Sequence, residues 1–221
     1  MLRFFEKYKF LAIVLMVISI IIISLIYQIL KPDVVLPVYQ PAQVSAELVD
    51  STLQHVKKYH TIGDFSLTNQ NGKTITSKDY EGKIFVADFF FTTCQTICPI
   101  LTDHMLQIQA ELKHDTNVLL LSHTVTPEID SVPQLKKYAL EKGVDDNKWN
   151  LVTGDKKEIY ELARKSYLAA KDNPFSENDL IHTENFVLVD TKKRIRGFYD
   201  GTKREAIAKL LEDIQILKEE H

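Results

Sequence analysis

The chain has 221 residues, a formal net charge of −3 and only two cysteines. This charge gives no sign of the basic surface that nucleic-acid binding requires, and two cysteines are too few for a scaffold held together by disulfides. The length suits one globular domain with a shorter appendage.

An uncharged apolar segment lies close to the N-terminus, at residues 10–30. A bilayer is crossed by about 20 such residues, whereas the apolar core of a cleaved signal peptide has roughly 7–15. We therefore expect an uncleaved transmembrane anchor. Three basic residues precede the segment and Lys31 alone follows closely, so residues 1–9 are expected in the cytoplasm and the rest outside. In a mitochondrion the outside would be the intermembrane space. The absence of a long Arg/Ser-rich transit segment favours instead the inner (cytoplasmic) membrane of a bacterium, with the domain on its periplasmic or outer side.

Residues 31–60 are interpreted as a connecting region. Three prolines within residues 32–41 indicate an extended spacer, and the apolar spacing over residues 45–59 predicts a short helix. The folded domain is expected over residues 61–221. It opens with two alternating segments around Asn69-Gln70-Asn71-Gly72, and an Asn-Gly turn between such segments predicts a β-hairpin.

Apolar runs and helical patterns alternate through the rest of the domain. Nearly continuous apolar runs are typical of strands buried on both faces. The predicted strands are 83–91, 117–122, 149–152, 185–190 and 194–199, and the predicted helices are 99–113, 131–142, 155–167 and 202–220. This order predicts an α/β domain whose central, partly parallel sheet has helices on both faces.

The two cysteines, Cys94 and Cys98, lie between a buried strand and a helix. Functional sites of α/β domains gather at this edge of the sheet, and a helix N-terminus favours the thiolate form of cysteine. If helical geometry begins near Cys94, both sulfurs lie on one helix face. The pair can form a redox-active disulfide or hold a soft metal. An inert structural disulfide is the third interpretation.

Among metals, thiolates select Cu(I), zinc or iron–sulfur centres. Structural zinc uses four protein ligands, and iron–sulfur clusters usually use four cysteines, so Cu(I) with two sulfurs and one imidazole fits best. His182, beside a Pro/Ser/Asn-rich loop and before a predicted strand, is the candidate imidazole. Asp88, inside a buried strand, must be paired or hydrogen-bonded. We expect His104 to face solvent and Met105 to lie in the core.

Residues 91–99 (FTTCQTICP) resemble the T-x-C-x-x-x-C-P motif of the Sco/SenC family. Met105 fits that family's helix, and residues 64–76 look like its opening hairpin. His182-Thr183, followed by a strand ending in Asp190, looks like its third copper ligand and the next strand. The resemblance covers roughly residues 61–217.

The resemblance implies a thioredoxin-like fold with an N-terminal β-hairpin, here preceded by a single transmembrane helix. It implies copper bound by Cys94, Cys98 and His182, and a role in assembling the dinuclear copper site of cytochrome c oxidase, whose copper-site subunit would be the partner. The alternative is a thiol–disulfide oxidoreductase that uses Cys94 and Cys98 to reduce the cysteines of a copper-site protein. These interpretations are compatible, so enzymatic activity stays open. A peroxidase is disfavoured because no arginine lies between Arg3 and Arg164.

Two details bear on these alternatives. Thioredoxin-type oxidoreductases have a cis-proline where this chain reads Ile181-His182-Thr183, and a histidine there favours metal ligation. The family often has Ser-x-Asp-Pro after its second buried strand, whereas residues 122–127 read SHTVTP. The aspartate is absent and His123 appears in a region expected near the cysteines.

Overall fold

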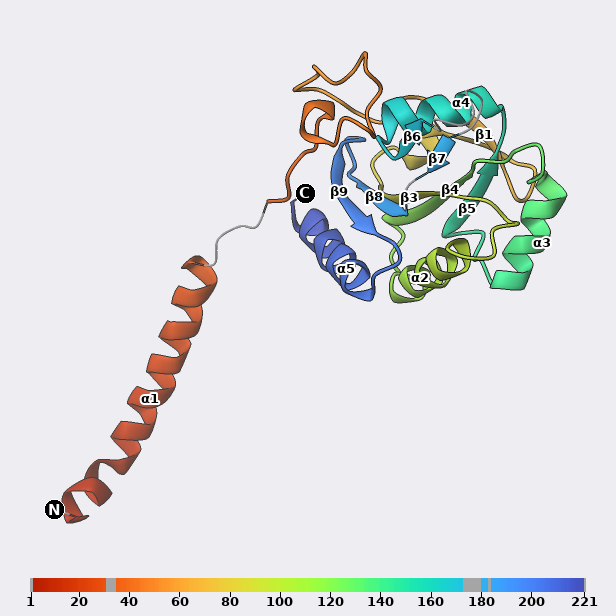
Figure 1. Cartoon of the computed structure of the whole chain (residues 1–221). Helices are drawn as coiled ribbons and strands as arrows, with labels where there is room; N and C mark the ends of the chain where they lie inside the picture. The colour runs from red at the N-terminus through yellow and green to blue at the C-terminus, as the bar shows by residue number, and fades with distance from the viewer. Residues whose placement is uncertain (1, 31–34, 173–179, 183, 221) are drawn as a thin grey trace. The chain divides into compact units, whose positions relative to one another are not determined.

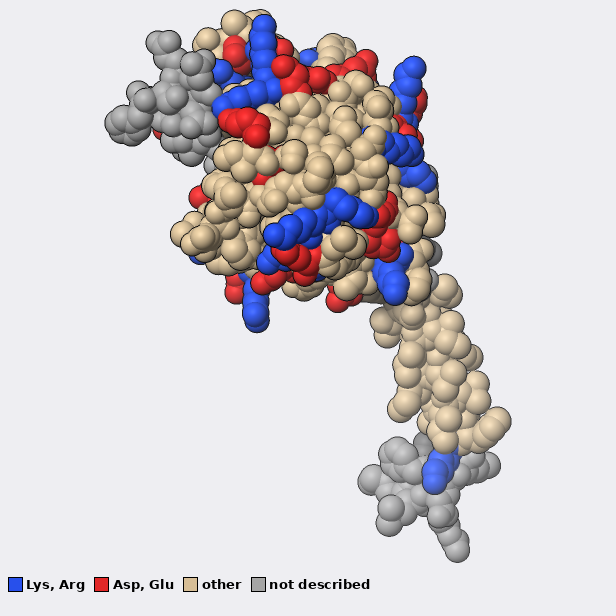
Figure 2. Space-filling view, turned by 90° about the vertical axis from the view of Figure 1, so that its right-hand side faces the viewer, with Lys and Arg blue, Asp and Glu red and all other residues tan. Residues whose placement is uncertain are grey.

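The computed structural model describes residues 2–30, 35–172, 180–182 and 184–220, with side chains for 8–27, 35–170 and 184–220. The chain divides into two units, residues 1–35 and 36–221. The first contains helix α1 (Leu2–Leu30). Its stretch Tyr8–Tyr27, with a mean hydropathy of 3.0, is long and apolar enough to cross a membrane. Figure 2 shows the described part of α1 almost entirely without charge.

The second unit is built on a mixed sheet with the strand order β2-β1-β5-β4-β3-β8-β9 (Figure 1). The three central strands β3, β4 and β5 are parallel, while the hairpins at both edges are antiparallel. This arrangement confirms the predicted partly parallel sheet. Its strands are β1 (Ser66–Asn69), β2 (Thr74–Thr76), β3 (Ile84–Phe90), β4 (Val118–Thr124), β5 (Trp149–Thr153), β8 (Asn185–Val189) and β9 (Ile195–Asp200).

Helices cover both faces of this sheet, each over its own hydrophobic cluster. One face carries α2 (Cys98–Glu111), α3 (Val132–Lys142) and α5 (Arg204–Glu219). The other carries α4 (Lys156–Glu161), which continues as a π-helix over Leu162–Ser166. Side chains of β3 alternate between the clusters, with Phe90 in the first and Phe89 in the second, as the two-residue period of a strand requires. The short 3₁₀ helices are η1 (Pro41–Gln43) and η2 (Ser77–Tyr80).

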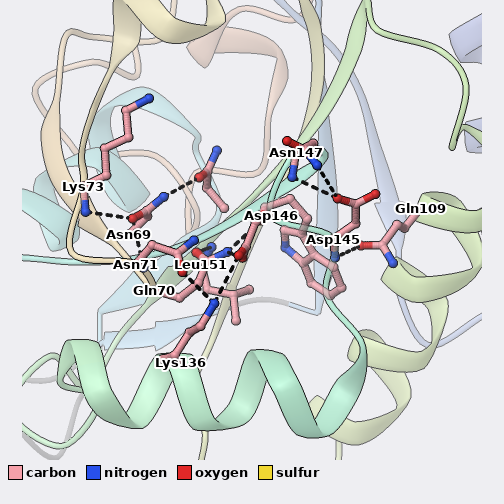
Figure 3. Close-up of polar contacts among 12 residues, drawn as sticks. Asn69, Gln70, Asn71, Lys73, Gln109, Lys136, Asp145, Asp146, Asn147 and Leu151 are labelled. Atoms are coloured by element: carbon pink, nitrogen blue, oxygen red, sulfur yellow. Dashed lines mark hydrogen bonds and ion pairs between the residues drawn. The ribbon is translucent and has the colours of Figure 1, made fainter.

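The predicted hairpin turn is joined to the rest of the sheet by side-chain hydrogen bonds (Figure 3). Gln70 accepts a hydrogen bond from the backbone N–H of Leu151 in β5 (2.9 Å) and donates one to the Asp146 carboxylate (2.8 Å). Lys136 of α3 pairs with the same carboxylate (3.1 Å). These contacts fix the hairpin against β5 and α3, so the edge opposite β9 is well anchored.

The predicted helix over residues 45–59 is wrong, because these residues form successive turns. The Asp50 carboxylate accepts hydrogen bonds from the backbone N–H (2.9 Å) and the hydroxyl (2.5 Å) of Thr52. Such local side-chain bonds compete with the helical pattern. Val49 packs into the second hydrophobic cluster, and the segment follows the surface of the domain.

A buried arginine holds the beginning of the second unit in place. Arg196 is 2% exposed. Its guanidinium donates hydrogen bonds to the carbonyl oxygens of Leu36 (2.7 Å) and Pro37 (3.0 Å). It also pairs with Asp190 (3.1 Å) at the end of β8 and with Glu220 (2.7 Å) after α5. One side chain thus connects the first residues of the unit with its last helix and a central strand.

Candidate metal and thiol site

The two cysteines lie at the N-terminus of α2, and both are free thiols. Strand β3 ends at Phe90, Cys94 lies in the following loop, and α2 begins at Cys98. Helical geometry therefore starts at the second cysteine, so the two do not share a helix face as the four-residue spacing suggested. The loop instead brings them together, because the backbone N–H of Cys98 donates a hydrogen bond to Cys94 Sγ at 3.3 Å.

The surroundings give the two thiols opposite acidities. Burial acts to raise the pKa of Cys94, but hydrogen bonds from the Cys98 thiol and from backbone N–H groups at the helix start outweigh it, and the pKa falls to about 7. Cys98 is 1% exposed. Burial, together with its hydrogen bond to Cys94, raises the pKa of Cys98 to about 12. Near neutral pH a substantial fraction of Cys94 is therefore thiolate, whereas the buried Cys98 stays a thiol.

The cysteine loop is fixed from behind by Asp130, which the sequence patterns did not point to. This fully buried carboxylate accepts hydrogen bonds from the backbone N–H (3.2 Å) and hydroxyl of Thr92. The hydroxyls of Thr124 and Thr126 donate to it as well. The sequence does place Thr124 and Thr126 shortly before Asp130, which could have suggested a local hydrogen-bonded turn. No local pattern indicates that these threonines share an acceptor with Thr92.

Asp88 lies on the cysteine side of the sheet, within β3. It is 3% exposed, and its carboxylate accepts a hydrogen bond from the Ser122 hydroxyl, which confirms the expectation that it must have a partner. Ser122 in turn accepts a hydrogen bond from the Trp149 indole (2.8 Å). Burial raises the pKa of Asp88 to about 7. Its negative charge also contributes to the raised pKa of Cys98.

The segment that follows Ser122 does lie beside the cysteine loop, as predicted, because Thr92 bonds Asp130, but the His123 side chain lies on the other face of the sheet. His123 follows Ser122 in β4, and adjacent strand residues point to opposite faces. The ring stacks on Phe89 (centroids 5.0 Å apart) and meets the edge of Tyr167 (5.1 Å). It is fully buried, and among the described residues neither ring nitrogen has a well-formed hydrogen bond, although the nearby Asp88 backbone acts weakly against the effect of burial on its pKa. Burial lowers its pKa to about 3, so the imidazole is neutral at physiological pH.

The backbone of His182 belongs to a small separate hairpin that the sequence did not predict. Strand β6 (Ala170–Asp172) pairs with β7 (Leu180–His182), and Ala170 lies opposite His182. The His182 side chain and most of the preceding loop lie outside the described residues, so ligation by His182 stays a prediction. Within the described parts of the chain, no group of three His, Cys, Asp or Glu side chains is gathered to hold a metal ion.

Of the predictions for Met105 and His104, two neighbouring residues of α2, one is confirmed and one is wrong. Met105 is fully buried in the first hydrophobic cluster, as expected. The expectation that His104 faces solvent is wrong, because it is 9% exposed and its Nδ1 lies 2.6 Å from the carbonyl oxygen of Gly201. This contact joins α2 to the turn before α5.

Comparison with known proteins gives consistent matches. The model of the SCO1/SenC family matches residues 54–218. The SCO1 protein homolog of Bacillus subtilis (strain 168) is 34% identical over 158 residues, which cover 71% of this chain and 82% of the relative.

Two solved structures show the same architecture. BsSco, described as a member of the Sco family of cytochrome c oxidase assembly proteins with a disulfide switch, is 33% identical, with a TM-score of 0.62, over 72% of this chain and 93% of the other. Arabidopsis thaliana ScoI, crystallised with copper bound, is 26% identical, with a TM-score of 0.56, over 69% of this chain and 97% of the other. The expected thioredoxin-like fold is thereby confirmed.

Proposed function

We propose that this chain, which belongs to the SCO1/SenC family, is a membrane-anchored copper chaperone that binds one copper ion through Cys94, Cys98 and His182. The observation that carries the proposal is the pair of free thiols at the N-terminus of α2, where the pKa of Cys94 is lowered to about 7. Two thiolates and one imidazole are ligands that Cu(I) prefers. A relative crystallised with copper supports the same cargo.

The acidity of the pair predicts how copper binds. Cys94 offers a thiolate at once, whereas Cys98 must lose its proton when the metal arrives. Copper binding therefore releases at least one proton, and the apparent affinity rises with pH. In the reduced, copper-free protein only Cys94 is a strong nucleophile, because Cys98 keeps its proton.

The recipient follows from the family. Because a similar protein is described as assisting cytochrome c oxidase assembly, we infer that the copper goes to the dinuclear copper site of that oxidase, in its copper-site subunit. The apolar stretch Tyr8–Tyr27 serves as a single-pass anchor. The basic residues before it support a cytoplasmic N-terminus and a copper-binding unit on the outer side of a bacterial inner membrane.

An anaerobic Cu(I) titration of the reduced second unit against a competing chelator tests this proposal. The variants are His182→Ala and, as a matched control, His114→Ala, whose histidine is exposed after α2. We expect one tight equivalent in the wild type and the control, and binding weaker by at least about tenfold in His182→Ala. Unchanged affinity in His182→Ala would remove His182 from the site. The absence of tight binding in the wild type would refute the carrier function.

Thiol–disulfide exchange is the second candidate function. The different pKa values of Cys94 and Cys98 favour it, because one thiol attacks readily while the other is held in reserve. The Cys94 thiolate would attack a disulfide of the target, releasing one target thiol and forming a mixed disulfide. The Cys98 thiol, once deprotonated, would then displace the second target thiol and close the Cys94–Cys98 disulfide. Two electrons pass to the target in this exchange.

The Cys98→Ser variant distinguishes this activity from copper transfer. It should accumulate mixed disulfides with a peptide that carries one intramolecular disulfide, while Cys94→Ser should form none. A Cys98→Ser protein that traps no peptide, although its Cys94 reacts with iodoacetamide, would count against the reductase interpretation.

A further inference from the structure

A basic cleft lies where the chain enters the second unit. Its volume is about 610 Å³, and it has three parts. The first residues of the unit form one wall, the segment 57–61 a second, and the turn between β8 and β9 the third. In Figure 1 these segments lie beside β9, at the side of the unit away from α3. The lining residues are Val38, Gln40, Gln43, Lys57, Lys58, Tyr59, His60, Thr61, Lys192 and Arg194.

The charge of the cleft is positive and mostly uncompensated. Four of its lining side chains are Lys or Arg, and the described lining includes neither Asp nor Glu. Arg194 is paired with the buried Asp190 (2.7 Å). Lys57, Lys58 and Lys192 are exposed and have no ion pair within the described chain. Figure 2 shows a different surface, over α3, on which positive and negative side chains are interspersed.

An aromatic side chain projects beside these lysines. Tyr59 is 93% exposed, and its φ of +67° lies in the left-handed region that non-glycine residues seldom adopt. Two contacts of the next residue, His60, hold the segment in place. The backbone N–H of His60 donates to Gln40 Oε1 (3.0 Å), and the His60 ring bonds the carbonyl oxygen of Ser166 (2.8 Å). A tyrosine held outward among lysines suits the interface between lipid headgroups and water.

Covalent connection keeps this cleft near the end of α1. The helix ends at Leu30 and the second unit begins at Leu36, so the intervening chain spans at most about 22 Å, whatever the orientation of the units. The cleft residue Val38 follows Pro37, whose carbonyl oxygen Arg196 holds. If α1 spans the membrane, as proposed above, the cleft stays within reach of the membrane surface.

We propose that the basic cleft docks the second unit onto the anionic lipid headgroups of the membrane that holds α1. Lys57, Lys58 and Lys192 lie against lipid phosphates, and Tyr59 lies at headgroup level. On a leaflet as anionic as a cytoplasmic one, each lysine near the surface contributes about a fivefold change in the docked-to-undocked ratio, so removing all three lowers that ratio by about a hundredfold in discs of that composition. The proposal rests on the membrane anchor but does not involve copper.

Hydroxyl-radical footprinting of the full chain in lipid nanodiscs tests the docking, with oxidation of Tyr59 read by mass spectrometry. Tyr59 should be oxidised several times more slowly in discs containing phosphatidylglycerol than in discs of phosphatidylcholine alone. High salt should abolish the difference, because it screens exposed charges. Leu140, which is 70% exposed on α3, should be oxidised equally in all discs.

The variants isolate the charge. Replacing Lys57, Lys58 and Lys192 together by glutamine should abolish the protection of Tyr59. Replacing the exposed lysines Lys113, Lys157 and Lys203 by glutamine should leave it intact. Equal oxidation in both kinds of disc, or protection that survives in the cleft variant, would refute the proposal.

Additional arms of the experiment distinguish lipid docking from the binding of free anions and from a failed anchor. Protection by inorganic phosphate in phosphatidylcholine discs would identify a site for free anions and overturn docking. A chain that does not enter the discs would refute the anchor, and docking with it. A Cu(I) titration on the same discs reports separately on the copper site, because neither Cys94 nor Cys98 lines the cleft.

Discussion

Replacing His123 with phenylalanine should stabilise the second unit. The imidazole is fully buried among aromatic rings, and neither of its nitrogens has a well-formed hydrogen bond to a residue that the structure describes. A buried polar group without a partner costs about 1–3 kcal/mol. A phenyl ring of similar size keeps the stacking on Phe89 and removes that cost. We therefore expect the free energy of unfolding of His123→Phe to exceed that of the wild type by about 1–3 kcal/mol at pH 7.5.

The difference in the free energy of unfolding between His123→Phe and the wild type should increase at acidic pH. Burial lowers the pKa of His123 in the folded protein from 6.5 to about 3. Between these values the unfolded chain takes up a proton that the folded chain does not, so wild-type stability falls by about 1.4 kcal/mol for each pH unit below 6.5. From pH 7.5 to 5.0 this amounts to about 2 kcal/mol. The phenylalanine variant lacks this proton, so the gap should grow by the same amount.

Urea unfolding of the reduced second unit at the two pH values measures both effects. The single tryptophan, Trp149, is buried and provides the fluorescence signal. His114→Ala is the control, because that histidine is exposed and its removal should leave the pH dependence unchanged. A gap of the same size at pH 7.5 and 5.0 would show that His123 takes up protons in the folded state. A destabilised His123→Phe protein would show that the imidazole has a partner whose loss is costly.

Three further predictions concern Cys94, Asp130 and Arg196. Iodoacetamide should label Cys94 rather than Cys98. The labelling rate should rise tenfold per pH unit at low pH and level off above the Cys94 pKa of about 7. A midpoint of the rate near pH 9 would contradict the hydrogen bonding assigned to the helix start. Asp130→Ala should lower the free energy of unfolding by about 3 kcal/mol or more, because the donors of Thr92, Thr124 and Thr126 lose their shared acceptor. A loss below about 1 kcal/mol in urea unfolding would show that Asp130 does not fix the loop. Arg196→Met should lower the free energy of unfolding by about 3–5 kcal/mol. Lys137→Met, which removes an exposed ion pair, should lower it by less than about 1 kcal/mol. Similar small losses for both variants in thermal unfolding would contradict the connecting role of Arg196.

The sheet was predictable because its strands carry their own signals. The apolar run that became β3 is buried along its whole length, and the Asn-Gly turn formed the expected hairpin. The position of Cys94 and Cys98 at the sheet edge followed from the same patterns. These features depend on residues near one another in sequence, which is why periodicity detects them.

The partners that complete the site and the fold could not be read from local patterns. Asp130 bonds Thr92, which lies 38 residues earlier, and Arg196 bonds Leu36, which lies 160 residues earlier. No short-range spacing marks such pairs. His123 illustrates a different limit. Its location near the end of a central strand was expected, but a strand sends alternate side chains to opposite faces, and a one-residue difference separates the cysteine side from the aromatic side.

The hydrogen bond from the Cys98 backbone to Cys94 Sγ makes the first turn of α2 sensitive to the chemical state of the sulfur. A thiolate places negative charge at the positive end of the helix, which stabilises that end by about 0.3–1 kcal/mol. A disulfide removes the charge, and a bound Cu(I) ion partly neutralises it. The reduced, oxidised and loaded proteins therefore present different electrostatic surfaces at one place. Under the copper-carrier function proposed above, a recipient that contacts this turn would meet a different charge on the loaded, empty and oxidised forms before any ligand is exchanged.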